Sequence, residues 1–558
     1  MYLYSVKPKY FCMKTLLLCI CMVPVLAIGQ SRKERKAQAK ADKETLDNIR
    51  KHIEFLADDK LEGRRTGSPG EMLAAQYIST QFAADQLLPK GDQAFTQEFS
   101  INEGKQLPAD ANSFTVNDKA LQLNKDYYPL AFSASAATEG ASSLSLREKG
   151  QPWFFDVADL LEDNKSNPHF NIFDVIAQEV RHTAPKGARA LIVFNSGSAI
   201  DNIQFNKNDE SAAASIPVVY LTHEGLKKYF ADPTDYYHLK LTVKLVPTSR
   251  KGRNVIGFID NQAPATVVIG AHFDHLGYGE DNNALDGKGQ VHNGADDNAS
   301  GTAALIELGR LLKNSNAKHN NYLLIAFSGE ELGLAGSTYW LAHNTLTPLN
   351  YMINLDMVGR YDSSKKLTIG GYGTSPVWGQ VLPALSDKNL LVKFDSTGAG
   401  PSDHASFYHR NIPVLFFFTN GHSDYHKATD DADKINYTAE LDVIKYVQHV
   451  VEATDGKGQL PFTRTSEPEV QVVNLPVTLG VMPDYGFNGT GMRIEAVSKG
   501  KTAEKIGLKP GDVLLQLGSY KFVDVPTYMQ ALAKFRKGDT TQLRYRRANV
   551  EKTVPVAF

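Results

Sequence analysis

Histidines and carboxylates recur in one part of the sequence at places where an apolar run gives way to a polar loop. His272, Asp274 and His275 directly follow the apolar run that ends at Ala271, and Asp297 lies in a loop that opens a helix. Three further clusters follow later apolar runs: Ser328-Gly329-Glu330-Glu331, Asn354-Leu355-Asp356-Met357 and Ser423-Asp424-Tyr425-His426. Histidine and carboxylate side chains are ligands that zinc and similar divalent ions accept. The pattern therefore predicts metal-assisted chemistry.

The elements that must position these clusters are predicted from the region after Asn254. Buried-strand runs alternate there with amphipathic helical segments: strands at 266–271, 322–327, 352–355 and 412–418, and helices at 302–312 and 438–451. This alternation favours an α/β sheet covered on both faces. Loops at the carboxyl ends of strands in such sheets converge on one crevice, so we expect the clusters to share one site. Two histidines and at least three carboxylates are costly to bring together without a metal ion.

The ordered motifs resemble those of the di-zinc aminopeptidases, peptidase family M28, over about residues 46–454. That family also contains glutamate carboxypeptidases and glutaminyl cyclases. The resemblance implies the zinc exopeptidase fold, with a mixed, mostly parallel sheet flanked by helices, and two Zn²⁺ ions per chain. It places His272 and Asp356 on one ion, Glu331 and His426 on the other, and Asp297 between the two.

The resemblance also assigns catalytic roles to two residues that bind no metal. Asp274 matches the carboxylate that orients the His272 imidazole, and Glu330 matches the general base. Two close cations activate a bridging water and polarise a carbonyl, while Glu330 takes the proton and returns it to the leaving amine. The implied reaction is amide hydrolysis. The resemblance further places a cis peptide bond between Asp297 and Asn298.

Other polar residues of this region receive weaker assignments. Ser402-Asp403-His404 resembles a family segment that lines the substrate pocket. A Ser/His/Asp hydrolase is excluded, since three consecutive residues cannot form the chain of nucleophile, base and orienting group. Four further histidines match no required position and are interpreted as surface residues or as residues behind the ligands: His275, His292, His409 and His422.

Length and composition indicate several folded domains. The chain has 558 residues, of which 42% are hydrophobic and 22% charged, and at roughly 100 to 200 residues per domain this length predicts about three to five domains. We expect the N-terminal part of the peptidase domain at 30–116, an inserted β-rich domain at 117–250, the part with the di-zinc site at 251–455, a linker at 456–476 and a small domain at 477–558.

The two flanking domains have resemblances of their own. The β-rich runs 190–194 and 216–220 resemble a protease-associated domain, with an unrelated β-rich insertion as the alternative. The segments 479–482 and 503–514 resemble a bacterial-type PDZ domain, in which the loop at 479–482 receives a peptide C-terminus. A domain that packs on the enzyme and binds no peptide is the alternative.

The first 29 residues are predicted to be a signal peptide. An apolar run at 16–28 follows Lys14 and ends in Ala27-Ile28-Gly29. The run is shorter than the roughly 20 residues of a membrane span, so no stable span is expected, although a retained anchor is the alternative. Met13 is an alternative start. The exported protein, periplasmic or secreted, would carry no disulfide, because all the cysteines precede the cleavage point: Cys12, Cys19 and Cys21.

The charge balance argues against a polyanionic partner. Sixty basic and 62 acidic residues give a net charge of -2, which offers no electrostatic reason to bind nucleic acid or an anionic membrane. The sequence therefore favours an exported zinc-dependent exopeptidase that acts on peptides, with an aminopeptidase as the first choice. A glutaminyl cyclase-type acyltransferase and a catalytically inactive peptide-binding adaptor are the alternatives, and the intact Glu330 argues against the adaptor.

Overall fold

The structure is a computed structural model of the chain. The predicted signal peptide at 1–29, with all three cysteines, lies outside the residues that it describes. Within the described part of the chain, no helix combines the length and the apolarity that crossing a membrane requires. The described residues are 32–165, 170–199, 201, 203–207, 209, 211–281, 283–346, 348–362, 366–385, 389–465, 477–483, 490–497, 500–523, 525–548 and 550–558.

A nine-stranded sheet forms the centre of the main body. Its order is β1-β11-β13-β12-β14-β17-β15-β16, and β2 pairs with the first part of β11. The central strands β13, β12, β14 and β17 run parallel, whereas β11 and β15 pair antiparallel with this set. The predicted mixed α/β sheet is confirmed. The strands are β1 Leu88–Pro89, β2 Thr96–Gln106, β11 Val246–Ile259, β12 Thr266–His272, β13 Asn321–Phe327, β14 Leu349–Leu355, β15 Leu367–Gly370, β16 Val392–Phe394 and β17 Val414–Phe418.

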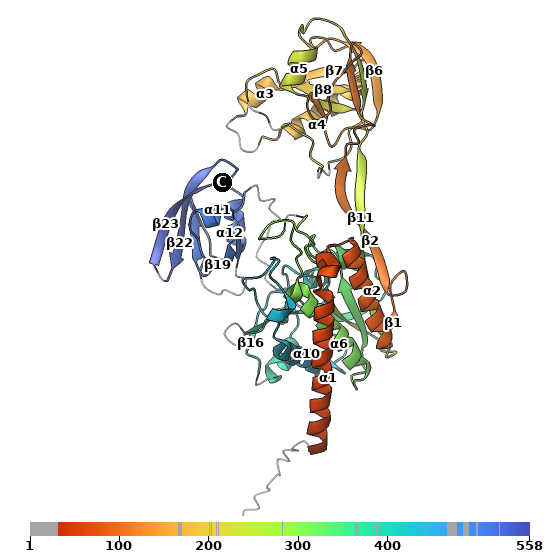
Figure 1. Cartoon of the computed structure of the whole chain (residues 1–558), viewed down its shortest axis with the longest axis vertical. Coiled ribbons are helices and arrows are strands. Elements are labelled where there is room, and N and C mark those ends of the chain that lie inside the picture. Colours follow the sequence, from red (N-terminus) through yellow and green to blue (C-terminus); the bar gives the residue numbers. More distant parts are fainter. Residues whose placement is uncertain are drawn as a thin grey trace, which may run out of the picture.

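Helices cover both faces of this sheet. Alternate residues of β12 face the two layers, with Val267 in one core and Val268 in the other, which is why the strand reads as a continuous apolar run. Figure 1 shows α1, α6 and α10 side by side on one face. The helices of that face are α1 Arg32–Leu56, α2 Pro69–Ala84, α6 Gly301–Lys313 and α10 Tyr437–Thr454, and those of the other are α7 Ala335–His343 and α9 His404–Tyr408.

Local sequence explains where the long helices begin. The Ser68 side chain accepts a hydrogen bond from the Glu71 N–H at the start of α2, and Pro69 occupies the first helical position. The Asn436 side chain caps α10 in the same way. Shorter helical turns of the main body lie at Asp59–Arg64, Tyr372–Thr374, Trp378–Val381, Leu382–Ala384 and Ala432–Lys434.

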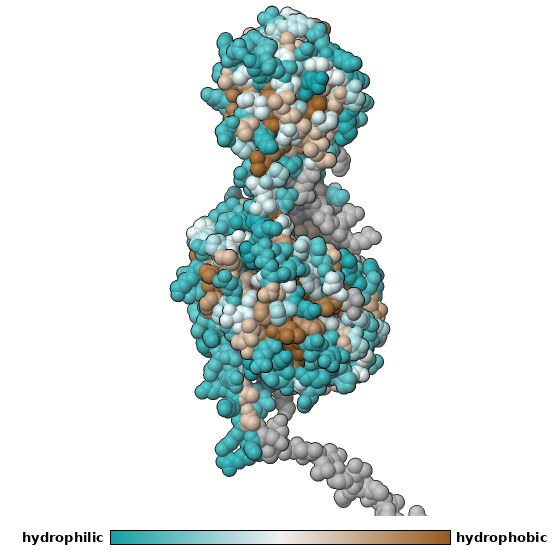
Figure 2. Space-filling model, turned by 90° about the vertical axis from the view of Figure 1, so that its right-hand side faces the viewer, coloured by the Kyte–Doolittle hydropathy of each residue, from teal (hydrophilic) through white to brown (hydrophobic). Residues whose placement is uncertain are grey.

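A separate lobe is inserted between β2 and β11. These two strands pair as an antiparallel ribbon that carries the lobe away from the main body, and Figure 2 shows the narrow waist between them. The lobe contains two four-stranded sheets, β4-β3-β10-β6 and β5-β9-β8-β7. Because β3 belongs to the first sheet, the lobe begins before residue 117, where the sequence placed its start. Its elements are β3 Ser113–Val116, β4 Lys119–Ala120, β5 Tyr127–Pro129, β6 Ala137–Ser142, β7 Trp153–Asp156, α3 Ala158–Asp163, α4 Ile172–Thr183, β8 Leu191–Phe194, β9 Val218–Leu221, α5 His223–Tyr229 and β10 Tyr237–Thr242.

The C-terminal domain has its own sheet and its own core. Strands β18-β19-β20-β22-β23 form the sheet, with β21 beside β20. The core around Leu479, Leu514 and Leu543 shares no residue with the core of the main body. The elements are β18 Val481–Pro483, β19 Met492–Val497, α11 Thr502–Lys505, β20 Val513–Leu517, β21 Tyr520–Lys521, α12 Val525–Leu532, β22 Thr540–Arg547 and β23 Val550–Ala557.

Part of the segment predicted as a linker packs on the main body. Leu460 is 4% exposed and belongs to the core of that body. The Thr463 N–H donates to the Thr374 carbonyl at 2.8 Å, and the Thr465 N–H donates to the Tyr408 hydroxyl at 3.0 Å. The packed part of the main body therefore extends to Thr465.

Candidate metal centre

The side chains predicted to bind metal lie at one edge of the central sheet. His272 ends β12, Glu331 follows β13, Asp356 follows β14, and His426 lies in the loop after β17. Asp297 lies in an irregular turn just before α6. Parallel strands end at the same edge of a sheet, so residues from distant parts of the sequence meet there.

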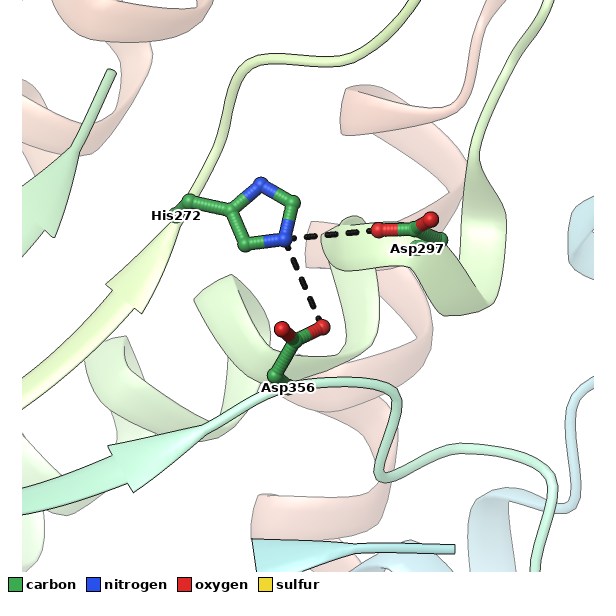
Figure 3. Close-up of side chains that lie close together, drawn as sticks. All are labelled: His272, Asp297 and Asp356. Carbon is green, nitrogen blue, oxygen red and sulfur yellow. Dashed lines mark hydrogen bonds and ion pairs between the residues drawn. The ribbon is translucent and has the colours of Figure 1, made fainter. Parts of the chain in front are cut away.

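His272, Asp297 and Asp356 form the first group of ligand atoms (Figure 3). The Nε2 atom of His272 lies 3.3 Å from Asp297 Oδ1 and 3.4 Å from Asp356 Oδ1. All three residues are buried. They are the residues that the sequence placed together around one zinc ion.

His426, Asp297 and Glu331 form the second group. The Nε2 atom of His426 lies 3.3 Å from Asp297 Oδ2 and 3.2 Å from Glu331 Oε2. The two carboxylate oxygens of Asp297 therefore face two different sets of side chains. A carboxylate in this position can bridge two metal ions, as two-metal sites require.

The spacing of these donor atoms fits zinc. Tetrahedral zinc with bonds of about 2.0 to 2.2 Å holds neighbouring donor atoms roughly 3.4 Å apart. The four pairs of donor atoms described above are separated by 3.2 to 3.4 Å. The carboxylate ligand atoms of Asp297 and Asp356 also lie within 4.8 Å of each other, and buried carboxylates this close repel one another unless cations neutralise them. Both the geometry and the charge of the site therefore suit metal ions.

Asp274 contacts His272 chiefly through its main chain. The Nδ1 atom of His272 lies 3.1 Å from the Asp274 carbonyl oxygen and 3.7 Å from its carboxylate Oδ1. That carboxylate accepts two other hydrogen bonds, from the Glu330 N–H at 3.2 Å and from the Thr66 hydroxyl at 2.8 Å. Asp274 therefore connects the imidazole of His272 with the start of the turn that carries Glu330.

The neighbouring residues Glu330 and Glu331 differ in environment. Glu330 lines the cavity beside the ligands, and burial, with the nearby carboxylates of Asp356 and Glu331, raises its pKa well above the usual value. Burial acts in the same direction on Glu331, but the charge and hydrogen bonds of His426 and His275 outweigh it and lower the pKa of Glu331 to about 2. The pKa values of these two neighbouring carboxyl groups are therefore shifted in opposite directions.

The turn that presents Asp297 is fixed by its neighbours. The peptide bond between Asp297 and Asn298 is cis, which confirms the prediction made from the sequence. The Asn298 side chain donates to the Leu355 carbonyl at 2.9 Å and accepts from the Met357 N–H at 3.1 Å. Asp430 Oδ2 accepts from the Asp297 N–H at 3.0 Å. These contacts tie the loop that carries Asp297 to the strand end that carries Asp356.

Comparison with known proteins identifies the main body. Residues 254–451 match the model of peptidase family M28, and residues 467–558 match that of the PDZ domain. Residues 254–451 therefore form a domain of peptidase family M28. The resemblance stated from the motifs is thus confirmed, as is the C-terminal PDZ domain.

Curated relatives of the M28 domain include named aminopeptidases. Aminopeptidase YwaD of Bacillus subtilis is 28% identical over 254 residues, which cover 43% of this chain and 50% of that protein. The chain thus spans half the length of this relative. A probable zinc metalloprotease of Pyrenophora tritici-repentis is 51% identical over 69 residues, which cover 12% of this chain and 14% of that protein.

Solved structures similar to the chain include two bacterial aminopeptidases. The aminopeptidase from Aneurinibacillus sp. strain AM-1 has a TM-score of 0.41 and 21% identity, covering 76% of this chain and 96% of that one. BSAP, a zinc aminopeptidase from Bacillus subtilis, has a TM-score of 0.41 and 20% identity, covering 75% of this chain and 98% of that one.

A cavity of about 280 Å³ opens beside the ligands in the M28 domain. His404 lies in its wall, where its ring stacks on Phe416 with a centroid distance of 4.3 Å, and Phe416 stacks in turn on Phe418 at 5.6 Å. Ser402 donates to Asp356 Oδ2 at 2.7 Å. The segment at 402–404, which the sequence placed at the substrate pocket, thus contacts both the ligands and the cavity.

Arg64 supports the site and was not singled out in the sequence. It is fully buried, and its guanidinium donates to the carbonyls of Phe273 at 2.7 Å, Asn293 at 2.6 Å, Gly294 at 3.0 Å and also Leu56. Burial lowers its pKa to about 10. The side chain ties the loop after β12 to the loop that leads to Asp297. Its position in an apparently polar loop gave no sign of burial.

The histidines left unassigned occupy different environments. His275 contacts Glu331, one of the predicted ligands. The Nε2 atom of His422 lies 3.1 Å from Asp296 Oδ2, and the Nε2 atom of His292 lies 2.8 Å from Asp286 Oδ1. His409 is exposed. Three of the four therefore lie behind the ligands or in the loops around them.

Proposed function

We propose that the chain is a zinc-dependent aminopeptidase that holds two zinc ions and hydrolyses N-terminal residues from peptides. His272 and Asp356 would hold one ion, Glu331 and His426 the other, and Asp297 both. The observation that carries this proposal is the division of the Asp297 carboxylate, whose two oxygens lie 3.3 Å from two different histidines. The relatives named as aminopeptidases and zinc metalloproteases support it.

Glu330 is proposed as the general base. Bound zinc lowers the pKa of water and polarises a carbonyl. Glu330 then accepts a proton from the attacking water and delivers it to the departing amine. Its carboxylate reaches the cavity, where Oε2 lies 4.0 Å from His272 Nε2, while its N–H is held by Asp274. Asp274 is proposed to orient His272 and Glu330 together.

The charge of the cavity favours a substrate amine over a substrate carboxylate. Asp297, Glu330, Asp356 and Asp395 line it, and no lysine or arginine occurs among the lining residues that the structure describes. A free ammonium group would find the carboxylate of Asp395, which lies outside the proposed ligand set, whereas a free C-terminal carboxylate would find no lysine or arginine among these lining residues. This difference supports an aminopeptidase rather than a carboxypeptidase.

The two flanking domains are proposed to act on substrate access and on the binding of a peptide C-terminus. The inserted lobe is proposed to be a protease-associated domain that limits or guides entry to the cleft. The PDZ domain is proposed to bind a peptide C-terminus at residues 479–482, with β18 as the edge strand that receives the peptide. Pro483, at the end of β18, lines the cavity beside the ligands. Export to the periplasm or the exterior is proposed on the basis of the apolar run at 16–28.

A screen with three substrate classes tests this function. The zinc-loaded full chain is incubated with aminoacyl p-nitroanilides, with the same compounds acetylated at the amine, and with peptides that begin with glutamine. Hydrolysis of the free aminoacyl compounds alone is the expected result. Release of ammonia from glutamine peptides without peptide cleavage would instead indicate a cyclase, and cleavage of acetylated compounds at an equal rate would exclude an aminopeptidase.

A further inference from the structure

His275 is buried and closely packed at the edge of the second ligand group. The residue is 2% exposed, and its main-chain N–H donates to the main-chain carbonyl of Arg64 at 3.2 Å. Its ring lies close to Gly294, because a Cβ added there would come within 2.4 Å of His275 Cδ2. Gly294 also has a φ of +54°, which glycine adopts at little cost. The backbone thus leaves space for this imidazole.

The imidazole of His275 contacts one oxygen of Glu331. Its Nδ1 atom lies 2.9 Å from Glu331 Oε1, whereas the other oxygen, Oε2, lies 3.2 Å from His426 Nε2. The distance from His275 Nδ1 to Asp297 Oδ2 is 3.9 Å, which is too long for a hydrogen bond. The two oxygens of Glu331 therefore have separate partners.

The terminal carboxylate of the first group has the same arrangement. Asp356 Oδ1 lies 3.4 Å from His272 Nε2, while Asp356 Oδ2 accepts a hydrogen bond from the Ser402 hydroxyl at 2.7 Å. In both groups, one carboxylate oxygen faces the histidine ligand and the other faces a residue outside the ligand set. His275 corresponds to Ser402 in this respect.

The environment of the second ring nitrogen of His275, Nε2, indicates whether Nδ1 binds a metal ion or donates a hydrogen bond. Nε2 is buried and has no hydrogen-bond partner among the described residues. If Nδ1 bound a metal, the ring proton would lie on Nε2, and a buried N–H without an acceptor is costly. If Nδ1 carries the proton, it donates to Glu331 Oε1, and Nε2 retains only an unshared lone pair. The second arrangement leaves no donor unsatisfied.

We propose that His275 is a positioning residue that donates from Nδ1 to Glu331 Oε1 and so reserves Oε2 of this carboxylate for the second zinc ion. The proposal rests on the proposed di-zinc function. It assigns His275 to the metal centre without making it a ligand. Partners of this kind orient carboxylate ligands, and their loss typically weakens metal binding by about 10- to 100-fold.

Two substitutions of similar polarity test this role. In His275→Asn the side-chain amide can place an N–H near the position of Nδ1, whereas in His275→Gln the amide lies one bond further out, near the position of Nε2. Zinc affinities are measured for the full-length chain by competition with a chelator, and the two sites are followed separately by the absorption of bound cobalt. Circular dichroism checks that each variant is folded.

His275→Gln is expected to weaken one of the two metal sites by about 10- to 100-fold and leave the other unchanged. His275→Asn should retain affinity closer to that of the parent, and Ser402→Ala should weaken the other site. Parent-like affinities in His275→Gln, equal loss at both sites, or equal loss in the Asn and Gln variants would overturn the role of His275. A parent chain that binds no zinc would overturn the proposed function itself.

Discussion

At the residue scale, four of the five ligands that the family resemblance implied follow an apolar run that becomes a strand, and the fifth, Asp297, precedes a helix. His272, Asp297, Glu331, Asp356 and His426 come together at the edge where the parallel strands end. The residues that hold them were harder to predict. Arg64 binds only carbonyl groups, and His275 contacts a carboxylate 56 positions away, so neither contact has a local sequence signal.

At the residue scale, Gly294 tests how tightly the metal-binding loops are packed. A Cβ in Gly294→Ala would lie 2.1 Å from the Asp297 carbonyl oxygen and 2.4 Å from His275. Gly456 has a comparable φ of +76°, but its nearest neighbour, His319, would be 3.7 Å away. Gly456→Ala should therefore lower the free energy of unfolding by about 1 to 2 kcal/mol, which is the conformational penalty alone. Gly294→Ala should lower it clearly more.

Thermal unfolding and zinc content of both glycine variants check this prediction. We expect Gly294→Ala alone to lose zinc, because the substitution displaces Asp297. Equal stability of the two variants, with zinc retained in both, would show that the loop accommodates a side chain and that the packing around His275 is loose.

At the element scale, the central strands and two of the helices that cover them followed from apolar periodicity. The helix predicted at 438–451 is α10, Tyr437–Thr454, and the strand predicted at 266–271 is β12, Thr266–His272. The periodicity did not reveal that α10 carries a fully buried carboxyl group. Both oxygens of Glu440 lack a hydrogen-bond partner among the described residues. Helical periodicity locates a buried face but does not report the polar residues that this face contains.

Glu440 is expected to make stability depend on pH. Burial, with a smaller effect from Asp296, raises its pKa well above the usual value, whereas the unfolded chain titrates near about 4.3. Because the folded pKa is the higher one, the contribution of the protonated group is complete below about pH 4.3 and is lost as the pH rises through the folded pKa. Glu440→Gln removes this loss.

Unfolding temperatures between about pH 5 and about pH 8 test the effect of Glu440. The advantage of Glu440→Gln over the parent should grow as the pH increases. Glu452→Gln, at an exposed position of the same helix, serves as the control and should follow the parent. A constant difference between Glu440→Gln and the parent would mean that Glu440 has no raised pKa.

At the scale of the whole molecule, domain order was easier to predict than domain limits. The inserted lobe starts earlier than expected because β3 pairs with β10, which is more than a hundred positions away. The main body extends into the predicted linker because Leu460 packs in its core. Both limits depend on contacts between distant segments, which local composition does not encode.

Two C-terminal truncations test where the peptidase body ends. A chain that ends at Thr465 loses the PDZ domain but keeps Leu460 and the Thr463 hydrogen bond, so it should retain zinc and hydrolyse small aminoacyl substrates. A chain that ends at Asp455 should be less stable by about 2 to 5 kcal/mol, the usual cost of removing a buried leucine side chain. Chemical denaturation, zinc analysis and rates on an aminoacyl p-nitroanilide compare the two. Loss of zinc and activity in the folded longer chain would show that the PDZ domain completes the site.

The central claim, that one chain holds two metal ions and a separate general base, is tested most directly by substitution of Glu330. Glu330→Gln preserves size and hydrogen bonding but cannot accept a proton. This variant should bind two zinc ions like the parent, while hydrolysis of an aminoacyl p-nitroanilide falls by roughly two to four orders of magnitude. Glu331→Gln, the matched control, should lose zinc first and recover partly at high zinc concentration. Loss of zinc from Glu330→Gln, or parent-like hydrolysis by it, would contradict the assigned roles.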